Sequence, residues 1–216
     1  MTASRGGVFV GCVLMLLLAI DPPTSLAEQL ELSIGRLNYA GFSEKQHCTA
    51  TLVAPQVALT ARHCLVDDDV REMHLLLGYE GDDWREHLRP ASAQFTALPG
   101  DIALLCLDQA STAEPIAIAD RPAERGETLL VIGYGRPNVY VANRTSCRVL
   151  HVDAQGAFLL DCPLTPGASG APVLRATDAG YEIVGVVSAT NGDASVGYGI
   201  ADQDGTAPCG PALPDN

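Results

Sequence analysis

Three polar residues, Ser169, His63 and Asp101, lie in local contexts that together could perform nucleophilic chemistry. Ser169 lies in the stretch TPGASGAP (165–172), where glycines and prolines set up a sharp turn that presents a small hydroxyl group. Most turns of this composition are ordinary surface loops, so the serine needs partners. A serine hydroxyl becomes an effective nucleophile when a general base takes its proton and a third group orients that base.

Two other segments supply candidate partners. His63 follows an apolar run in LTARHC (59–64), and Asp101 opens the strongly apolar run DIALLCL (101–107). Taken singly, such an aspartate is usually a turn residue. The remaining histidines are interpreted as structural or solvated; they are His47, His74, His87 and His151. The hypothesis of a catalytic triad therefore rests on the three contexts in combination.

The elements that must position these residues are short β-favouring runs separated by Gly, Pro and Asp. No segment has the pattern of an amphipathic helix of three turns, which indicates an all-β protein. The stretch 109–126, rich in Ala, Pro and charged residues, is interpreted as a linker between two halves. We expect strands at 32–37, 49–53, 57–60, 73–78, 102–107, 128–134, 157–160 and 183–188.

The N-terminal segment has the pattern of a secretory signal peptide, with Arg5, an apolar run over 8–20 and small residues that end at Ala27. An uncleaved N-terminal anchor helix is the alternative. Cleavage after Ala27 leaves 28–216, which is one domain's worth of chain without a further apolar run of membrane-spanning length. We expect a secreted or periplasmic protein that has no membrane contact after signal removal.

The charge balance disfavours a nucleic-acid partner. The formal net charge is −13, and Lys and Arg are not clustered as phosphate binding requires.

The cysteines indicate disulfides rather than a metal site. Removing the signal peptide also removes Cys12, and the remaining even number in an exported chain predicts three disulfides, with fifteen pairings open. No C-x-x-C pair occurs, and the His-Cys neighbours are adjacent in sequence rather than at the spacing of zinc ligands, so no metal is expected.

Taken together, these motifs resemble those of the chymotrypsin-like (trypsin-like) serine proteases. The histidine, aspartate and serine contexts occur in the family's chain order. The stretch CTATLVAPQVALTARHC (48–64) is similar to the family's first-barrel core, VIGYG (131–135) resembles the strand that opens the second barrel, and IVGVVS (183–188) resembles the strand that lines the substrate cleft. The resemblance covers about 34–200.

The resemblance implies both a fold and a function. The implied fold is two six-stranded antiparallel β-barrels, about 28–108 and 124–205, with a tail over 206–216 and the active site in the cleft between the barrels. The implied function is that of an exported serine endopeptidase, a monomer without a cofactor that hydrolyses polypeptides through an acyl-enzyme.

Each site residue takes its role from the resemblance. Ser169 attacks the substrate carbonyl, His63 is the general base, and Asp101 orients the imidazole. The N–H groups of Gly167 and Ser169 form the oxyanion hole. The pocket walls align with 163–168, 188–190 and about 196–198, and the candidate substrate-binding residues are Pro163, Val187, Ser188, Ala189 and Thr190.

The disulfide pairing follows partly from the resemblance, which implies Cys48–Cys64. Cys147 and Cys162 flank a predicted hairpin with Gln155-Gly156 at its turn, and Cys106 and Cys209 are the pair that remains.

The sequence departs from the digestive members of the family. Their Asp before the nucleophile, which pairs with a new N-terminus, is replaced by Ala168, and their cysteine four residues before the nucleophile is replaced by Thr165. The Gly-x-Ser-Gly-x-Pro pattern is closer to the bacterial branch that includes glutamyl endopeptidases, although Val187 replaces the His of those enzymes. We therefore expect no zymogen switch and a preference for uncharged, small-to-medium apolar substrate residues, with Asp193 as the residue that would instead anchor Lys or Arg.

Two other functions compete with this one: a non-catalytic protease homologue that binds a partner through the same cleft, and an unrelated secreted β-sandwich binding module. Protease homologues that have lost their activity commonly lack a triad residue, whereas this chain keeps all three. The chain order His, Asp, Ser and the absence of a complete G-x-S-x-G motif argue against an α/β-hydrolase.

Overall fold

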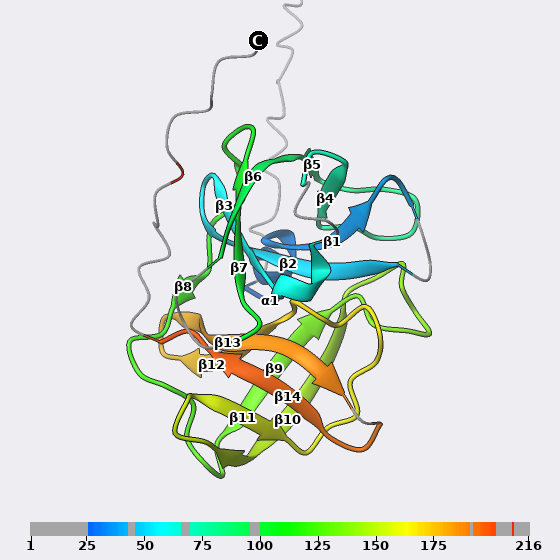
Figure 1. The fold of residues 1–216 in the computed structure, drawn as a ribbon. Helices are drawn as coiled ribbons and strands as arrows, with labels where there is room; N and C mark the ends of the chain where they lie inside the picture. The colour runs from blue at the N-terminus through cyan, green and yellow to red at the C-terminus, as the bar shows by residue number, and fades with distance from the viewer. Residues whose placement is uncertain are drawn as a thin grey trace, which may run out of the picture.

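A computed structural model of the chain describes residues 26–42, 46–65, 70–95, 100–190, 192–201 and 209. The chain folds into two β-barrels that lie one above the other (Figure 1). Most of the expected signal peptide (1–27) lies outside the described residues, and of the expected tail (206–216) only Cys209 is described.

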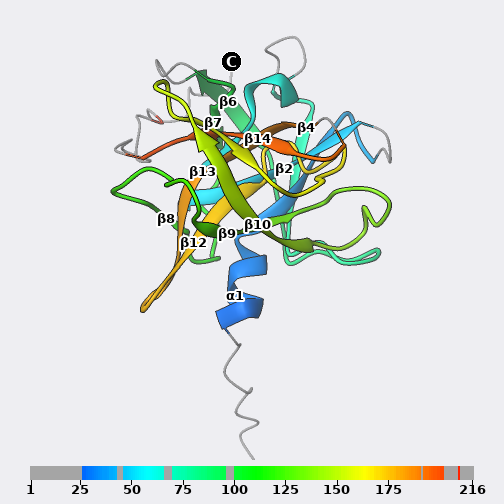
Figure 2. The same ribbon diagram turned by 90° about the horizontal axis from the view of Figure 1, so that it is seen from below.

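The first barrel is a nearly closed antiparallel sheet with the strand order β5-β4-β1-β2-β3-β7-β6. Its elements are α1 (Leu26–Leu32), β1 (Ile34–Tyr39), β2 (His47–Ala54), β3 (Val57–Thr60), η1 (Arg62–Cys64), β4 (Met73–Leu77), β5 (Glu86–Leu88), β6 (Pro90–Phe95) and β7 (Ala103–Leu107). Helix α1 precedes the sheet and extends outward from the barrels (Figure 2).

Strands β3 and β7 form the part of this barrel that positions the site. Both are apolar runs whose residues are all buried, and they pair antiparallel with Thr60 opposite Ala103. Antiparallel pairing places the end of one strand beside the start of the other. The residues just after β3 and just before β7, which include His63 and Asp101, are thereby brought together.

The second barrel is closed, because its end strands β12 and β13 also pair with each other in the order β12-β9-β10-β11-β14-β13. Its strands are β9 (Thr128–Gly133), β10 (Asn143–Val152), β11 (Ala157–Leu160), β12 (Pro172–Thr177), β13 (Gly180–Thr190) and β14 (Ser195–Gly199). The prediction of an all-β fold with two barrels is confirmed. The first sheet has seven strands rather than the expected six.

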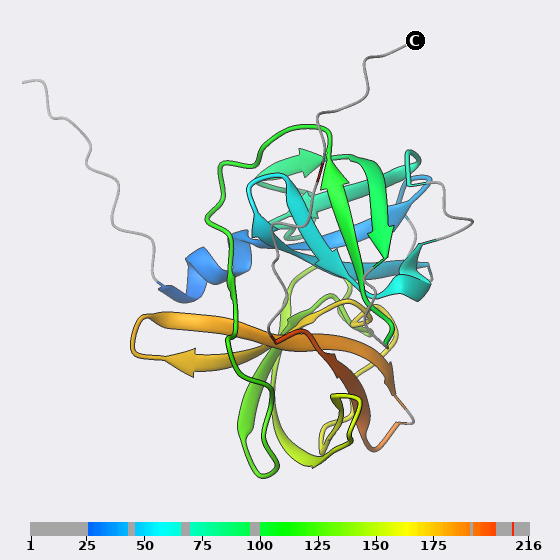
Figure 3. The same cartoon turned by 60° about the vertical axis from the view of Figure 1, so that its left-hand side comes forward.

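The segment 109–126 runs along the outside from the first barrel to the second (Figure 3). It contains the short strand β8 (Ala117–Ile118), which pairs parallel with β13 and adds a seventh strand to the second sheet. The sequence predicted a linker without a strand here. A strand of two residues is too short to show the alternating pattern by which strands are recognised.

The two barrels share buried contacts. One buried cluster fills the first barrel and continues through Ile132 and Tyr134 to strands of the second, and another fills the second barrel around Phe158. The Tyr134 hydroxyl accepts a hydrogen bond from the Tyr79 N–H at 3.1 Å and donates to the Tyr79 carbonyl at 3.2 Å. Burial raises the pKa of Tyr134 well above its usual value, so the phenol stays neutral and the bond is kept.

Three disulfides join the expected pairs, Cys48–Cys64, Cys106–Cys209 and Cys147–Cys162. The first spans β2 and η1, directly beside His63. The third joins β10 to the segment after β11, at the base of the loop that carries Ser169.

Candidate active site

His63 and Asp101 form a direct contact at the rim of the first barrel. The imidazole Nδ1 lies 2.5 Å from Asp101 Oδ2, and the other carboxylate oxygen accepts the backbone N–H of His63 at 2.8 Å. The His63 side chain is 48% exposed and that of Asp101 is 21% exposed. The carboxylate therefore holds the Nδ1 edge of the ring, while about half of the His63 side chain stays accessible.

Asp101 has a further partner in the second barrel. The Ser188 hydroxyl, on β13, donates to Asp101 Oδ2 at 2.6 Å. Burial alone would raise the pKa of Asp101, but the hydrogen bonds from Ser188 and His63 outweigh it and hold the pKa below its usual value. Asp101 is therefore a carboxylate at neutral pH, which acts as an acceptor toward the imidazole.

Ser169 lies in the second of two consecutive tight turns just before β12, the turn that the Ala171 N–H closes by donating to the Ala168 carbonyl at 2.9 Å. The turn before it has Pro166 and Gly167 at its centre and is closed by the Ala168 N–H, which donates to the Thr165 carbonyl at 3.0 Å. Gly167 has a φ of 101°, which is the conformation that a type II turn requires after proline. The sequence TPGA is therefore matched to this backbone.

The Ser169 hydroxyl donates to the Ser188 carbonyl at 3.4 Å. Ser169 and His63 are both described, and no hydrogen bond joins their side chains in this structure. Ser188 lies between Ser169 and Asp101 instead. Its carbonyl accepts a hydrogen bond from the Ser169 hydroxyl, and its own hydroxyl donates to Asp101.

The backbone of the Ser169 loop offers two hydrogen-bond donors. The N–H groups of Gly167 and Ser169 donate no hydrogen bond to any of the described residues, whereas the neighbouring N–H groups of Ala168 and Gly170 do so. Gly167 is buried and Ser169 half-buried, so unused donors there are unusual. Such a pair is suited to an oxyanion.

Two of the candidate substrate-binding residues contact this loop, since the Ser188 carbonyl accepts the Ser169 hydroxyl and the Val187 carbonyl accepts the Gly170 N–H. Pro163, Ala189 and Thr190 are exposed and Ser188 is half-buried, whereas Val187 is 2% exposed in the core of the second barrel. The Thr190 hydroxyl donates to the Ala194 carbonyl at 3.1 Å, which closes the turn between β13 and β14.

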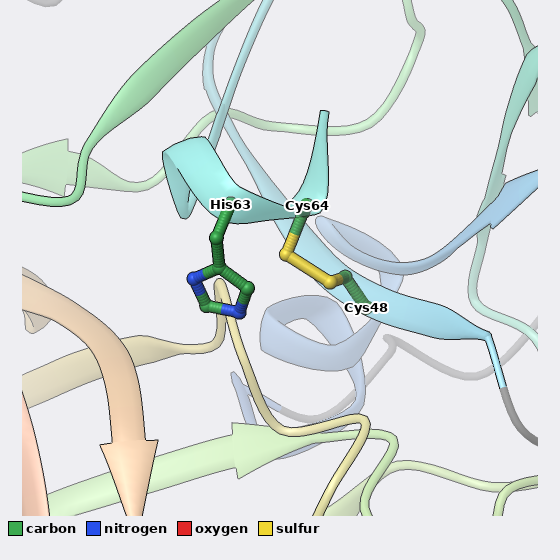
Figure 4. A group of neighbouring side chains, drawn as sticks. All are labelled: Cys48, His63 and Cys64. Atoms are coloured by element: carbon green, nitrogen blue, oxygen red, sulfur yellow. A yellow bond between two sulfur atoms is a disulfide. The ribbon is translucent and has the colours of Figure 1, made fainter. Parts of the chain in front are cut away.

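One group of potential metal ligands occurs among the described residues, and it does not fit a metal. Atoms of Cys48, His63 and Cys64 lie within 4.8 Å of one another. Figure 4 shows that the two sulfur atoms are bonded to each other beside the histidine ring. A disulfide sulfur is not a thiolate, and the imidazole Nδ1 is engaged by Asp101.

The sequence of the chain matches a family model described as "Trypsin-like peptidase domain" over residues 48–186. The chain belongs to the trypsin-like peptidase family. The matched segment contains the His63, Asp101 and Ser169 contexts. Among curated proteins, none matches the chain significantly.

Solved structures of trypsin-like folds are similar to the chain. One is the thermostable serine protease AL20 from an extremophilic microorganism, with a TM-score of 0.65 and 18% identity over 80% of this chain and 93% of that one. Another is the protease Anisep from Arthrobacter nicotinovorans, with a TM-score of 0.63 and 15% identity over 79% of this chain and 91% of that one. At these identities the likeness shows the shared fold.

The sequence did not identify the contacts that three residues make around the site. Ser188 was expected only as a pocket residue, yet it binds Asp101. Thr49, on β2, was not singled out, yet its backbone N–H donates to the Ser169 carbonyl at 2.8 Å. His47 was interpreted as structural or solvated, and its Nε2 lies 2.7 Å from the Tyr134 carbonyl behind the turn at Gly167. Their partners include backbone groups, which leave no motif in the sequence.

Among the described residues, no helix has the length and apolarity needed to cross a membrane.

Proposed function

We propose that this member of the trypsin-like peptidase family is an exported serine endopeptidase that cleaves polypeptides through an acyl-enzyme intermediate. The observation that carries the proposal is the position of Asp101, whose carboxylate contacts His63 and Ser188, while Ser188 also contacts Ser169. The orienting group Asp101 thus contacts the general base His63 directly and is linked to the nucleophile Ser169 through Ser188.

The chemistry assigned to these residues is acyl transfer. Rotation about the Cα–Cβ bond of Ser169 would exchange the Ser188 carbonyl for His63 Nε2 as partner of the hydroxyl. The Ser169 oxygen then attacks the substrate carbonyl while His63 takes the hydroxyl proton, and Asp101 stabilises the imidazolium.

Breakdown of the intermediate uses the same groups. His63 gives the proton to the leaving amine as the C–N bond breaks, which leaves an acyl ester on Ser169. Water then attacks this ester, with His63 again as base, and releases the carboxylic acid and the free serine. The N–H groups of Gly167 and Ser169 stabilise the oxyanion in both steps, and each such donor typically supplies about 3 to 4 kcal/mol. The reaction needs no cofactor.

Export is part of the proposal. It rests on the signal-peptide pattern of 1–27 and is supported by the three disulfides, which persist in oxidising compartments. The mature chain 28–216 is proposed to act as a monomer.

The proposed substrate residue on the acyl side of the cut is uncharged, apolar and small to medium in size. The segments assigned to the pocket walls, 163–168, 188–190 and 196–198, contain no charged residue, so a buried Lys or Arg would lack a partner. Val187 places an apolar side chain where glutamyl endopeptidases have His, which removes an anchor for acidic residues.

A labelling experiment tests the proposed activity. The purified mature protein and Ser169→Ala are treated with a fluorophosphonate, which reacts with an activated serine. We expect covalent modification of the wild type alone. If neither protein is labelled, the non-catalytic binding homologue is the better description, and the hydrogen bond of Ser169 to the Ser188 carbonyl would then be its resting arrangement.

A peptide library tests the specificity. We expect cleavage after small and medium apolar residues. Cleavage mainly after Arg or Lys, with that preference lost in Asp193→Ala, would reject this assignment and identify Asp193 as the anchor.

A further inference from the structure

The turn that carries the Gly167 N–H is held in place without the ion pair that digestive relatives use. In those relatives an Asp before the nucleophile pairs with a new N-terminus. Here the corresponding Ala168 is 5% exposed and packs in the apolar core of the second barrel. Some other group must therefore fix the conformation of this turn.

Thr49 contacts the Ser169 loop with its hydroxyl and its backbone N–H, while its carbonyl contacts Thr60 on β3. Its hydroxyl donates to the Gly167 carbonyl at 2.9 Å and accepts the Tyr134 N–H at 3.0 Å. Its N–H donates to the Ser169 carbonyl at 2.8 Å, and its carbonyl accepts the Thr60 hydroxyl at 2.8 Å. Thr49 is 0% exposed, so water cannot replace these bonds.

The peptide on the other side of Gly167 is held as well. The Pro166 carbonyl accepts the Arg136 N–H at 3.1 Å. In a trans peptide the N–H points opposite to the C=O, so this bond directs the Gly167 N–H away from Arg136. The Thr165 hydroxyl donates to the Arg136 carbonyl at 2.7 Å, which fastens the same two segments a second time.

Close packing completes the restraint. A Cβ added at Gly167 would lie 2.4 Å from the Tyr134 carbonyl oxygen and 2.3 Å from His47 Nε2, so only glycine fits at this position. Tyr134 is itself tied to Thr49 through its N–H. Thr49 therefore bridges the turn and the segment that the turn packs against.

We infer that Thr49 is a positioning residue that fixes the Gly167 turn in its oxyanion-binding conformation and replaces the N-terminal ion pair of digestive relatives. The inference rests on the proposed function in so far as the turn serves catalysis. Thr49 does not touch the substrate; it acts through the orientation of the Gly167 peptide.

Thr49→Val tests the inference, because a methyl group replaces the hydroxyl and leaves the Gly167 carbonyl and the Tyr134 N–H without this partner. We expect kcat for peptide hydrolysis to fall about 10- to 100-fold with little change in KM, which is less than the 10²- to 10³-fold loss on deleting an oxyanion donor. Thr49→Ser keeps the hydroxyl and is expected to retain activity. Thr51→Val is the matched control, since Thr51 lies on the same strand, is equally buried, and its hydroxyl has no hydrogen-bond partner among the described residues.

A crystal structure of Thr49→Val in the Ser169→Ala background gives a readout that does not need activity. We expect the Gly167 φ to leave its positive value or the Pro166–Gly167 peptide to turn over. An unchanged turn overturns the inference, and so does an equal loss of kcat in Thr51→Val. If the turn moves in Thr49→Val but the wild type neither cleaves peptides nor reacts with a fluorophosphonate, the proposed function fails while the positioning role stands.

An N-terminal extension provides a second test of the inference if Thr49→Val does not fold. A mature protein with Gly-Ser added before Glu28 is expected to cleave peptides at the rate of the unextended chain. If the extension abolishes activity in a normally folded protein, a free N-terminus sets the turn and the role assigned to Thr49 is wrong.

Discussion

The two sides of the candidate site are held by different means. His63 and Asp101, from the first barrel, are joined mainly through side chains at a half-exposed rim. Ser169, from the second barrel, lies between the buried glycines Gly167 and Gly170 in a loop held largely through its backbone. Single side chains on the first side can therefore be exchanged without loss of the fold, whereas the nucleophile loop has no space for a new atom.

Gly170→Ala is expected to have the largest effect, because it tests the rigid side of this comparison. An added Cβ would lie 2.1 Å from the Thr49 carbonyl oxygen and 2.3 Å from the Thr60 hydroxyl, at a φ of 81°. We expect activity to be lost and the melting temperature to fall steeply. Gly156→Ala is the control, since Gly156 has a similar φ of 83° and nothing within 4 Å of the added atom. Equal melting temperatures and retained activity in both variants would contradict the idea that the Ser169 loop is the rigid side of the site.

Asp101→Asn tests the exchangeable side. The amide cannot act as a carboxylate toward His63 and favours the wrong imidazole tautomer, so turnover is expected to fall on the order of 10⁴-fold. The fold should persist, as near-ultraviolet circular dichroism would report. Full activity would mean that another carboxylate orients His63. Asp193 would then be the candidate, because Asp153 accepts the N–H groups of Gln155 and Ala157 in the β10–β11 turn.

Asp101 also makes the free energy of unfolding depend on pH. Because its folded-state pKa lies below its usual value, ionised Asp101 stabilises the fold above the unfolded-state pKa, and this contribution is lost as the pH falls through the folded-state pKa. The Ser169→Ala protein is compared with the double variant Ser169→Ala, Asp101→Asn. At neutral pH the protein that keeps Asp101 should have the higher free energy of unfolding, by a constant amount. The difference should shrink below about pH 4. Urea titrations across this range measure it, and a difference that grew in acid would contradict the assignment.

Ser188→Ala is expected to have a smaller effect. It removes the 2.6 Å hydrogen bond to Asp101 and keeps the Ser188 carbonyl that accepts from Ser169. A hydrogen bond to a charged group is worth about 1.5 to 3 kcal/mol, so we expect a loss of about 10- to 150-fold in kcat/KM, together with a rise in the pKa of Asp101. Ser146→Ala, at an exposed serine on β10, is the control. Unchanged kinetics in Ser188→Ala would show that His63 alone suffices to hold the carboxylate.

Removal of the Cys106–Cys209 disulfide should affect activity least. The bridge closes a chain separation of 103 residues at the far end of β7, so a double Cys→Ser variant is expected to lose about 3 to 5 kcal/mol of stability on a chain-entropy estimate. Its kcat at low temperature should equal that of the wild type. A large loss of kcat in the folded variant would show that the tail influences the cleft.

The sequence predicted those features that reside in local patterns. The apolar runs of β3 and β7 were recognisable because every residue in them is buried, and they determine where His63 and Asp101 meet. The hairpin between Cys147 and Cys162 was recognisable from Gln155-Gly156 at its turn. No strand was expected at β5, β6, β8, β12 or β14, and β10 was expected only as one arm of that hairpin. Two of these, β5 and β8, are only three and two residues long and therefore show no alternating pattern.

The contacts that hold the nucleophile loop were not predictable in this way. Thr49 meets Gly167 across 118 positions of the sequence, and its partners are a backbone carbonyl and a backbone N–H, which every residue carries. Only the arrangement of the two barrels shows which threonine of β2 faces the loop, since Thr49 and Thr51 look alike in the sequence.

The contacts of Thr49, on the first barrel, with the Ser169 loop of the second also limit the exchange of single barrels between relatives. A chimera that takes its first barrel from one relative and its second from another would keep His63 and Asp101 on one piece and Ser169 on the other. The turn at Gly167 would nevertheless face whatever residue the donor supplies at position 49. Barrel exchange should therefore succeed only between partners matched at position 49 and across 165–170, so that the two barrels would have to be exchanged together with the contacts between them.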